Sequence, residues 1–425
     1  MSAPLARVLL PDTAEVAPDG SLIIGGCRVL DLVEEHGTPL FVYDEAHLRD
    51  RCREAVAAFG ADHVVYATKA FLCRAMARLA SEEGLLLDVA SGGELHVALS
   101  AGVPAERCVF HGNNKSVEEL RFALTAGVRH VNVDSFEEIA RIEELVASGL
   151  PAPRVQLRIT PGVHAHTHEY IATGQDDSKF GFNLADGAAA EAVRYAKDSR
   201  AMDLVGLHCH IGSNVFAVES FGRAAEVMAE FARPFALPEL TLGGGLGVAY
   251  LADESAPSIT EWGRVVLDAV AGTGLDAEVH VEPGRSIVAA AAITTYTIGV
   301  VKRLPGIRTY IAVDGGMSDN PRPVLYGSGY EAFLPRAVEA ARPRRARVVG
   351  KHCESGDVLI FNAALPEDVT VGDVLATPVT GAYGRSMASN YNMITRPPVV
   401  FVRDGVAQLV VRRETYEDLL ACDLG

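Results

Sequence analysis

The chain has 425 residues, more than one hydrophobic core usually serves, so two domains are expected. Its 49% hydrophobic and 22% charged residues are typical of a folded globular protein. The net charge of −17 leaves no basic excess to neutralise phosphates. It therefore argues against a nucleic acid or an anionic membrane as a partner, but it allows one small anionic ligand at a local site.

The cysteines and the apolar runs bear on where the chain works. The seven cysteines form no C-x-x-C pair and are odd in number, which favours a reduced, cytoplasmic setting. Residues 1–20 lack a basic start followed by a long apolar core, so no signal peptide is expected. The weakly polar run Ser286–Val301 contains a serine and three threonines and falls short of the roughly 18 apolar residues of a membrane span. We expect a buried strand there and no membrane partner.

The middle of the chain repeats one pattern, a short apolar run followed by a turn and a helical segment. The eight runs are His63–Lys69, Leu85–Ala90, Cys108–His111, His130–Asp134, Arg154–Thr160, Leu204–Ile211, Glu239–Gly243 and Glu278–Glu282. Helical patterns between them include Leu72–Glu83, Gly93–Ala101, Val117–Ala126, Phe136–Ser148, Phe221–Phe235 and Ile259–Ala271. Apolar strands that alternate with helices indicate a parallel sheet buried on both faces, and eight repeats predict a closed (β/α)8 barrel. A doubly wound open sheet is the alternative.

From Thr294 onward the pattern changes to short strands separated by turns. The strands are expected at Tyr310–Val313, Arg347–Val349, Asp357–Phe361, Val374–Pro378 and Val399–Val402. The pair Asp404-Gly405 is a hairpin signal between Val399–Arg403 and Ala407–Arg412. We therefore expect an all-β domain in the C-terminal part of the chain.

The N-terminal segments Leu22–Leu30 and Leu40–Tyr43 are also strand-like. If they pair with the C-terminal domain, the barrel is an insertion between two parts of one β domain. The expected division is a barrel at 45–290 and a β domain made of 1–44 and 291–425.

Residues suited to chemistry follow the predicted barrel strands. They are Lys69, Asp88, Ser91, His111, Asn113, Asn114, His208, His210, Gly212, Ser213, Gly243–Gly247 and Glu282–Arg285. In a (β/α)8 barrel the loops after the strands converge on one mouth, where active sites lie. This coincidence is the clearest functional signal in the sequence.

The glycine-rich loop Gly243-Gly244-Gly245 follows the seventh run. Glycine lets the backbone approach an anion, and barrels often bind phosphate with the loops after strands seven and eight. The plain alternative is a flexible turn. Gly284 and Arg285, in the next loop, favour the phosphate interpretation.

Three residues of the mouth allow two interpretations each. Lys69 follows an apolar run, and burial would favour its neutral, nucleophilic amine; the alternative is a strand-end lysine that reaches solvent. Glu282 is either part of the reaction or of a structural salt bridge. His210 either stacks on a flat ligand or is a core histidine.

The predicted β domain holds three further polar loops, at 319–326, 351–357 and 381–392. In the second loop, carboxylates at Glu354 and Asp357 flank Cys353, which favours a protonated thiol that can donate a proton.

A metal site is the rival interpretation. His208 and His210 share one face of a strand, and His164, His166 and His168 have the same spacing, as in a zinc-dependent barrel hydrolase. That interpretation leaves the glycine loop, Lys69 and Glu282 without a use, so no metal is expected.

From Phe41 to near its C-terminus the chain resembles the diaminopimelate decarboxylases, pyridoxal-phosphate enzymes of the alanine-racemase-like group. The matching motifs are YATKA at 66–70, DVASGGE at 88–94, HGNNK at 111–115, AHTHEYIATG at 165–174, SKFG at 178–181, GLHCHIGS at 206–213, EPGR at 282–285, DGGM at 314–317, NPRP at 320–323, CESGD at 353–357 and SNYN at 389–392. Single motifs are weak, but this many in order are specific.

The resemblance implies the roles of individual residues. Lys69 would bind pyridoxal 5'-phosphate covalently, His210 would stack on its ring, and Glu282 would pair with its pyridine nitrogen. The phosphate and the rest of the cofactor would be held by Asp88, Ser213, Gly243, Gly244, Gly245, Gly284, Arg285 and Tyr383. The substrate would be held by Arg285, Arg322, Tyr326, Glu354 and Tyr383.

The resemblance also implies how the active site is completed. Cys353 would return a proton to the α-carbon after carbon dioxide leaves, and the Cys353-Glu354 segment would come from the second subunit of a homodimer. Ornithine- and arginine-type relatives usually carry aspartate where this chain has Glu354, which favours diaminopimelate as the substrate. Two alternatives stay open, a decarboxylase of another diamino acid and a non-catalytic homologue, although Lys69 and Cys353 together argue against the latter.

Overall fold

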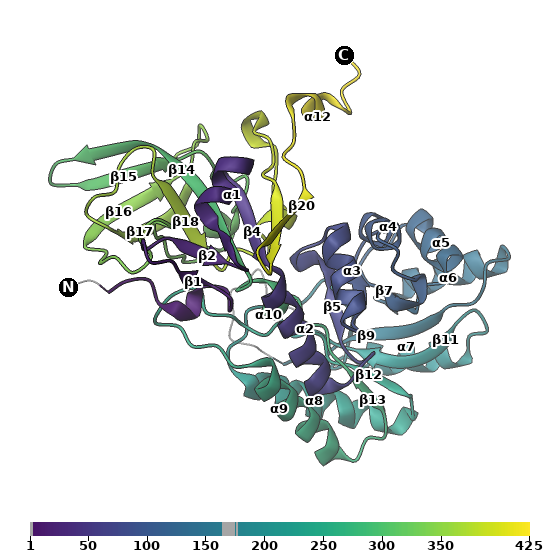
Figure 1. Ribbon diagram of the computed structural model, residues 1–425. Helices are drawn as coiled ribbons and strands as arrows, with labels where there is room; N and C mark the ends of the chain where they lie inside the picture. The colour runs from purple at the N-terminus through teal and green to yellow at the C-terminus, as the bar shows by residue number, and fades with distance from the viewer. Residues whose placement is uncertain (1–2, 164–174, 176) are drawn as a thin grey trace. The chain divides into compact units, whose positions relative to one another are not determined.

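The computed structural model describes residues 3–163, 175 and 177–425. Contacts within the chain divide it into two compact units (Figure 1). Residues 51–247 and 256–286 form one unit, the barrel domain, and residues 1–50, 248–255 and 287–425 form the other, the β domain. Each unit is described by itself.

The barrel domain is built on eight parallel strands that neighbour one another in chain order. They are β5 (Val65–Ala67), β6 (Leu86–Val89), β7 (Cys108–Phe110), β8 (His130–Val133), β9 (Arg154–Thr160), β11 (Asp203–His208), β12 (Glu239–Thr241) and β13 (Glu278–His280). All eight lie within or overlap the runs expected from the sequence. A two-residue strand, β10 (Phe182–Asn183), also pairs with β9.

The barrel closes where the first strand meets the last. Val64 and Val281 form a parallel bridge, and the Val65 N–H donates to the Val281 carbonyl at 2.8 Å. The Val281 N–H donates to the His63 carbonyl at 3.0 Å. The predicted (β/α)8 barrel is therefore confirmed, and the open doubly wound alternative is wrong.

Helices connect successive strands of the barrel domain (Figure 1). They are α2 (Glu45–Phe59), which leads into the domain, α3 (Arg74–Glu82), α4 (Gly92–Ser100), α5 (Val117–Ala126), α6 (Phe136–Ala147), α7 (Ala188–Asp198), α8 (Val218–Ala232) and α9 (Ile259–Thr273). Four of them begin after a serine whose hydroxyl accepts the backbone N–H of a glutamate three residues on; these serines are Ser91, Ser116, Ser135 and Ser258. Such N-caps satisfy an unpaired N–H and fix where a helix starts.

The β domain contains a large sheet with the strand order β17-β16-β15-β14-β4-β19-β20, in which β18 also pairs with β14. Its strands are β4 (Leu40–Asp44), β14 (Ala292–Leu304), β15 (Arg308–Val313), β16 (Arg344–Val349), β17 (Val358–Leu365), β18 (Val374–Pro378), β19 (Val399–Arg403) and β20 (Val406–Val411). β4 lies between β14, to which it is antiparallel, and β19, to which it is parallel. The expected pairing of the N-terminal strand with the C-terminal domain is confirmed.

The expectation of one strand at Leu22–Leu30 is wrong. The segment forms β2 (Leu22–Ile24) and β3 (Cys27–Arg28), which with β1 (Glu15–Val16) make a separate three-stranded sheet, and then helix α1 (Val29–His36). Gly25 and Gly26 have φ angles of 57° and 79° and turn the chain between the two strands. Only glycine adopts this conformation at no steric cost, so the Gly-Gly pair was the signal for a hairpin.

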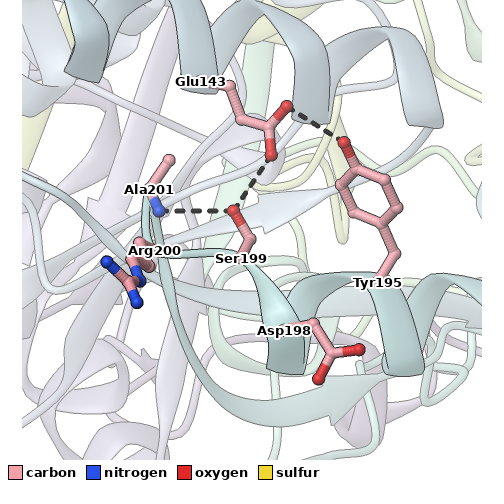
Figure 2. Close-up of a pocket in the computed structure, with 6 residues that line it drawn as sticks. All are labelled: Glu143, Tyr195, Asp198, Ser199, Arg200 and Ala201. Atoms are coloured by element: carbon pink, nitrogen blue, oxygen red, sulfur yellow. Dashed lines mark hydrogen bonds between the residues drawn. The ribbon is translucent and has the colours of Figure 1, made fainter.

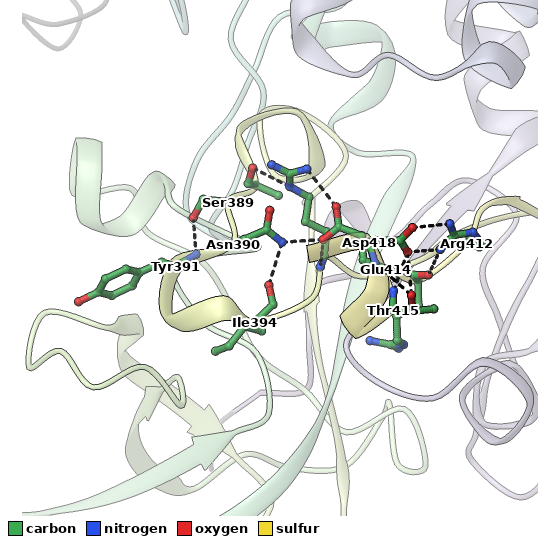
Figure 3. A network of polar contacts seen from close by, with 11 residues as sticks. Ser389, Asn390, Tyr391, Ile394, Arg412, Glu414, Thr415 and Asp418 are labelled. Atoms are coloured by element: carbon green, nitrogen blue, oxygen red, sulfur yellow. Dashed lines mark hydrogen bonds and ion pairs between the residues drawn. The ribbon is translucent and has the colours of Figure 1, made fainter. Parts of the chain in front are cut away.

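The C-terminal residues are ordered by ion pairs (Figure 3). The predicted hairpin turn is present, with positive φ at Asp404 and Gly405. Beyond β20, the Glu414 carboxylate accepts from Arg396 at 3.0 Å and from the Asn390 amide at 2.6 Å. The short helix α12 (Tyr416–Leu420) begins with a capping box. Among the described residues, no helix combines the length and the apolar character needed to cross a membrane.

Candidate active site

Three buried side chains meet at the carboxyl ends of the barrel strands. Glu282 follows β13, His111 follows β7, and His208 ends β11. The His208 Nε2 lies 2.9 Å from Glu282 Oε2, and the His111 Nε2 lies 3.0 Å from Glu282 Oε1. None of the three is more than 6% exposed. A single carboxylate is thus held between two imidazole rings in the interior of the barrel.

The two histidines decide the charge of Glu282. Burial by itself would raise the pKa of this carboxyl, but His111 and His208 outweigh it and hold the pKa well below its usual value. Burial opposes a charged ring at His111 too, yet the carboxylates of Asp88 and Glu282 raise its pKa. Burial lowers the pKa of His208, which acts as a neutral hydrogen-bond donor. The cluster therefore carries a stable glutamate anion.

Lys69 lies on the same rim, after β5, the strand that closes the barrel against β13. It belongs to the 3-10 turn Thr68–Ala70 directly after β5, and its side chain is exposed. The expectation that an apolar setting would desolvate Lys69 is therefore wrong for the chain by itself, because the turn lifts the lysine out of the apolar run. The lysine is accessible to a ligand that enters the mouth.

The ring of His210 is oriented by the glycine-rich loop. The Gly244 N–H donates to His210 Nδ1 at 3.3 Å, and the side chain is half-buried. Burial, together with the Lys69 ammonium, holds the pKa of His210 well below its usual value. A neutral ring with one partly open face is suited to stack on a flat ligand.

The loop Gly243–Gly245 is tightly packed and is not a loose turn. A Cβ at Gly244 would lie 1.9 Å from the Glu282 carbonyl oxygen, and one at Gly245 would lie 2.0 Å from the Gly212 carbonyl oxygen. Gly243 and Gly245 also have φ angles of 58° and 113°. Only glycine fits these three positions. The N–H groups of Gly245 and Leu246 have no acceptor among the described residues, as expected for a loop that binds an anion.

Two more predicted residues come together beside this loop. Arg285, at the start of helix α10 (Arg285–Val288), donates from Nη2 to the Ser213 hydroxyl at 2.9 Å. Gly284 is equally confined, because a Cβ there would lie 2.9 Å from the Ala67 Cβ. Asp88, in β6, is buried, and its Oδ1 lies 3.8 Å from His111 Nε2. The predicted cofactor-binding residues of the barrel domain therefore gather at one mouth.

The predicted residues of the β domain form two groups. Cys353 and Glu354 are exposed on a loop, and the Cys353 N–H donates to the Asn392 side-chain oxygen at 3.0 Å. Asp357 does not flank the thiol as expected, because its buried carboxylate accepts from the backbone and ring of His352, each at 2.9 Å. Asp357 thus shapes the loop that presents Cys353.

Arg322 begins the short helix α11 (Arg322–Tyr326) and is 4% exposed. Its guanidinium lies over the Tyr250 ring at 4.2 Å and donates to the Tyr330 hydroxyl at 2.5 Å. Tyr326 and Tyr383 are half-buried, and Tyr383 has a φ of 60°, a strained value for a tyrosine. Aromatic neighbours hold the arginine charge in place without neutralising it.

Sequence reasoning named His111 and His208 but gave them no part beside Glu282, and it missed Arg158 entirely. Arg158 lies in β9, over the Phe180 ring at 4.2 Å, and Asp134, Glu282 and Asp88 act on it electrostatically. Its signal was an arginine inside the apolar run Val155–Thr160.

The zinc interpretation rested on two histidine sets. The ligating atoms that converge at the mouth belong to His111, His208 and Glu282, whereas His210 is bonded to the glycine loop. His164, His166 and His168 lie outside the described residues.

A separate hollow of about 460 Å³ lies on the barrel domain, between helices α6 and α7 (Figure 2). The Glu143 carboxylate accepts there from the Tyr195 hydroxyl at 3.1 Å and from the Ser199 hydroxyl at 2.9 Å. No residue predicted for the active site lines it.

Comparison with known proteins agrees with this geometry. Residues 45–289 match the model of the pyridoxal-binding domain of pyridoxal-dependent decarboxylases. The chain belongs to the pyridoxal-dependent decarboxylase family. It is 48% identical to the diaminopimelate decarboxylase of Bacillus subtilis over 98% of both chains, and 47% identical to that of Mycobacterium tuberculosis over 95% of both.

The fold of this decarboxylase is also shared. The crystal structure of diaminopimelate decarboxylase from M. jannaschii in complex with L-lysine superposes with a TM-score of 0.90 and 33% identity, covering 97% of this chain and 98% of that one. Family membership makes pyridoxal phosphate the cofactor. The Gly243–Gly245 loop and the anionic Glu282 are chemically suited to its phosphate and its pyridine nitrogen.

Proposed function

We propose that the protein decarboxylates meso-2,6-diaminopimelate to L-lysine and carbon dioxide, the last step of lysine biosynthesis. The observation that carries this proposal is the Glu282 anion, fixed between His111 and His208 at the mouth of the barrel. A buried carboxylate that stays ionised is what an enzyme needs to keep a pyridine nitrogen protonated.

The site residues of the barrel domain have different tasks. Bound pyridoxal phosphate supplies a sink for the electron pair that stays behind when carbon dioxide leaves. Lys69 would provide the amine that anchors the cofactor, Glu282 would hold the proton on the ring nitrogen, and His210 would cover one face of the ring. Gly243–Gly245, Ser213, Gly284 and Arg285, with Asp88 and Tyr383, hold the phosphate and the remaining polar groups.

The β domain supplies the proton that completes the reaction. Cys353 donates its thiol proton to the α-carbon after carbon dioxide has left, and its exposure is suited to this task. The enzyme acts as a homodimer in which the Cys353-Glu354 segment serves the active site of the partner subunit. In this division, residues 45–290 bind the cofactor, and 1–44 with 291–425 carry the substrate-binding and interface loops.

Substrate choice is set by groups that face the distal end of the diamino acid. The carboxylates of the substrate are bound by Arg285, Arg322, Tyr326 and Tyr383. The Glu354 carboxylate accepts hydrogen bonds from the distal ammonium. A hydrogen bond to a charged group contributes about 1.5–3 kcal/mol, so a substrate that lacks the distal carboxylate leaves an arginine without a partner. Ornithine and arginine lack that carboxylate, and they are the alternative substrates.

All seven cysteines are free, which supports work in the reducing cytoplasm. The proposal is tested first by reduction with borohydride in the presence of pyridoxal phosphate. Peptide mass spectrometry is expected to find the cofactor mass on Lys69. An unmodified Lys69, with the adduct elsewhere or absent, would refute the anchoring role.

The substrate is tested separately. Release of carbon dioxide is measured with meso-diaminopimelate, ornithine, arginine and lysine at equal concentrations. We expect kcat/KM for meso-diaminopimelate to exceed the others by at least about tenfold, the factor that 1.4 kcal/mol of one lost charged contact implies. Faster turnover of ornithine or arginine would replace the proposed substrate and leave the Lys69 result intact.

A further inference from the structure

A second cluster of two histidines and one glutamate lies at the amino ends of the barrel strands. His63 precedes β5, and Glu278 and His280 belong to β13. Their potential ligand atoms all lie within 4.8 Å of one another, with 3.9 Å between His63 Nε2 and Glu278 Oε2. Glu278 and His280 stand four and two residues before Glu282, about 13 Å and about 7 Å in extended chain, and the groups that act on Glu282 are His111 and His208, not members of this cluster.

The strongest evidence for a ligand comes from the ring of His280. It is 2% exposed, and neither of its ring nitrogens has a hydrogen-bond partner among the described residues. A buried polar group without a hydrogen-bond partner destabilises the fold, so such groups usually have a ligand or a water that completes them. One of these nitrogens faces His63 and Glu278.

His63 is already oriented as a ligand. Its Nδ1 lies 3.0 Å from the Phe59 carbonyl oxygen. A carbonyl can only accept, so Nδ1 carries the hydrogen and Nε2 keeps its lone pair toward the cluster. A histidine that donates its other N–H to a carbonyl is the usual arrangement of metal-binding imidazoles.

We propose that His63, Glu278 and His280 form a zinc(II) site at the base of the barrel. Two imidazoles and one carboxylate are a known zinc ligand set, and water completes the tetrahedron. Zinc bonds of about 2.0–2.1 Å place tetrahedral ligands about 3.3 Å apart, so the 3.9 Å pair closes by under about 1 Å. The Glu278 side chain is 62% exposed and free to make this movement.

The position of the site defines its role. His63 leads into the first strand of the barrel, and Glu278 and His280 lie on the last strand. The Val64–Val281 bridge joins these two strands. A bound ion therefore ties together the seam at which the barrel closes. The site stabilises the fold and takes no part in the chemistry at the mouth.

The test uses the cofactor-loaded enzyme, because bound cofactor covers the other histidine–glutamate cluster. Metal-free protein is dialysed against zinc chloride, bound zinc is measured by elemental analysis, and Tm is measured with and without zinc. We expect one zinc per chain and a rise in Tm of about 3–5 °C at saturating zinc. Magnesium chloride, an ion that prefers oxygen ligands, is expected to give no shift.

Variants locate the ion. His63→Gln and Glu278→Gln alter partly exposed side chains, so the fold is expected to persist, and each should lose the zinc-dependent rise in Tm and bind zinc at least tenfold more weakly. His96→Gln, which alters an exposed histidine on α4, should behave like the wild type. Absence of zinc binding by the wild type, or zinc binding that survives in both His63→Gln and Glu278→Gln, would overturn the proposal.

Discussion

Two buried carboxylates, one in each domain, have opposite charge preferences. Glu282 of the barrel domain has two imidazoles as neighbours, and its pKa lies well below the usual value. In the β domain, burial raises the pKa of Asp319 to about 7, and the charges of Asp357 and Asp314 add to the effect. Asp319 accepts from the Tyr296 hydroxyl at 2.5 Å and from the Gly316 N–H at 2.8 Å. Neither of these two donors carries a positive charge.

The difference teaches that burial sets the cost of a charge and neighbours decide whether the charge is kept. Glu282 stays ionised beside its two imidazoles, whereas the Asp319 carboxyl, with a pKa of about 7, keeps its proton below that pH while it accepts from Gly316. Two residues of the same chemistry thus have different uses, and four experiments test this distinction.

The largest effect is expected from Glu282→Gln. A neutral amide cannot hold the proton on the cofactor ring, so kcat should fall about 10²–10³-fold, the usual cost of removing one preorganised electrostatic group. Carbon dioxide release from meso-diaminopimelate measures it, with Glu191→Gln, on the exposed side of α7, as the control. Wild-type turnover by Glu282→Gln would show that the reaction does not need the Glu282 anion.

The next largest effect is expected from Cys353→Ala in the β domain. Loss of a proton donor should lower kcat by about 10²-fold, while the absorbance of the bound cofactor stays unchanged. Cys422→Ala changes the other exposed cysteine and should keep full activity. If Cys353→Ala lost the cofactor instead, the thiol would belong to cofactor binding and not to proton transfer.

A smaller effect is expected from Gly244→Ala, which presses on the backbone of Glu282. The added Cβ would lie 1.9 Å from the Glu282 carbonyl, so we expect a loss of about 1–3 kcal/mol in the free energy of unfolding and weaker cofactor binding. Gly272→Ala, in helix α9 with nothing within 4 Å, should be neutral or slightly stabilising. Urea unfolding and cofactor titration compare the two, and equal behaviour would show that the loop yields to the extra methyl group.

The last effect concerns pH. Between pH 3.8 and about 7 the folded chain keeps a proton on Asp319 that the unfolded chain has released. The folded state then binds more protons, so this group lowers the free energy of unfolding as pH rises through the window, by at most about 1.4 kcal/mol per pH unit, and adds no slope above it. Asp319→Asn mimics the protonated acid and should remove this slope.

Urea unfolding at pH 5 and pH 7.5 checks the prediction. Relative to the wild type, Asp319→Asn should gain stability on going to the higher pH. An unchanged difference between the two proteins at both values would mean that Asp319 is ionised in the fold, like Glu282.

Much of the fold was predictable because its signals are local. Each barrel strand is a short apolar run followed by a turn, and Arg154–Thr160 was predicted with the bounds that the structure gives. Helices α5 and α9 start where a serine caps them, which a sequence displays directly. The failure at Leu22–Leu30 came from treating two glycines as part of a strand, although they turn it back on itself.

The site was harder to predict, because its electrostatics depend on contacts between distant parts of the chain. Glu282 meets His111 and His208 only once the barrel has closed, and no local pattern gives that distance. The exposure of Lys69 follows from a single turn of 3-10 helix, a detail that an apolar run does not reveal. The identities of the residues were readable, whereas their charge states were not.

The position of β4 in the sheet has a consequence for synthesis on the ribosome. β4 is completed at Asp44, but β14, its antiparallel neighbour, begins only at Ala292. At 5–20 residues per second, the roughly 250 intervening residues take about 12–50 s to emerge. Leu40–Tyr43, fully buried in the finished protein, must stay soluble for that time while the barrel, nearly continuous in the chain, is free to fold first. Nascent chains stalled before Ala292 should therefore be the form that most depends on chaperones.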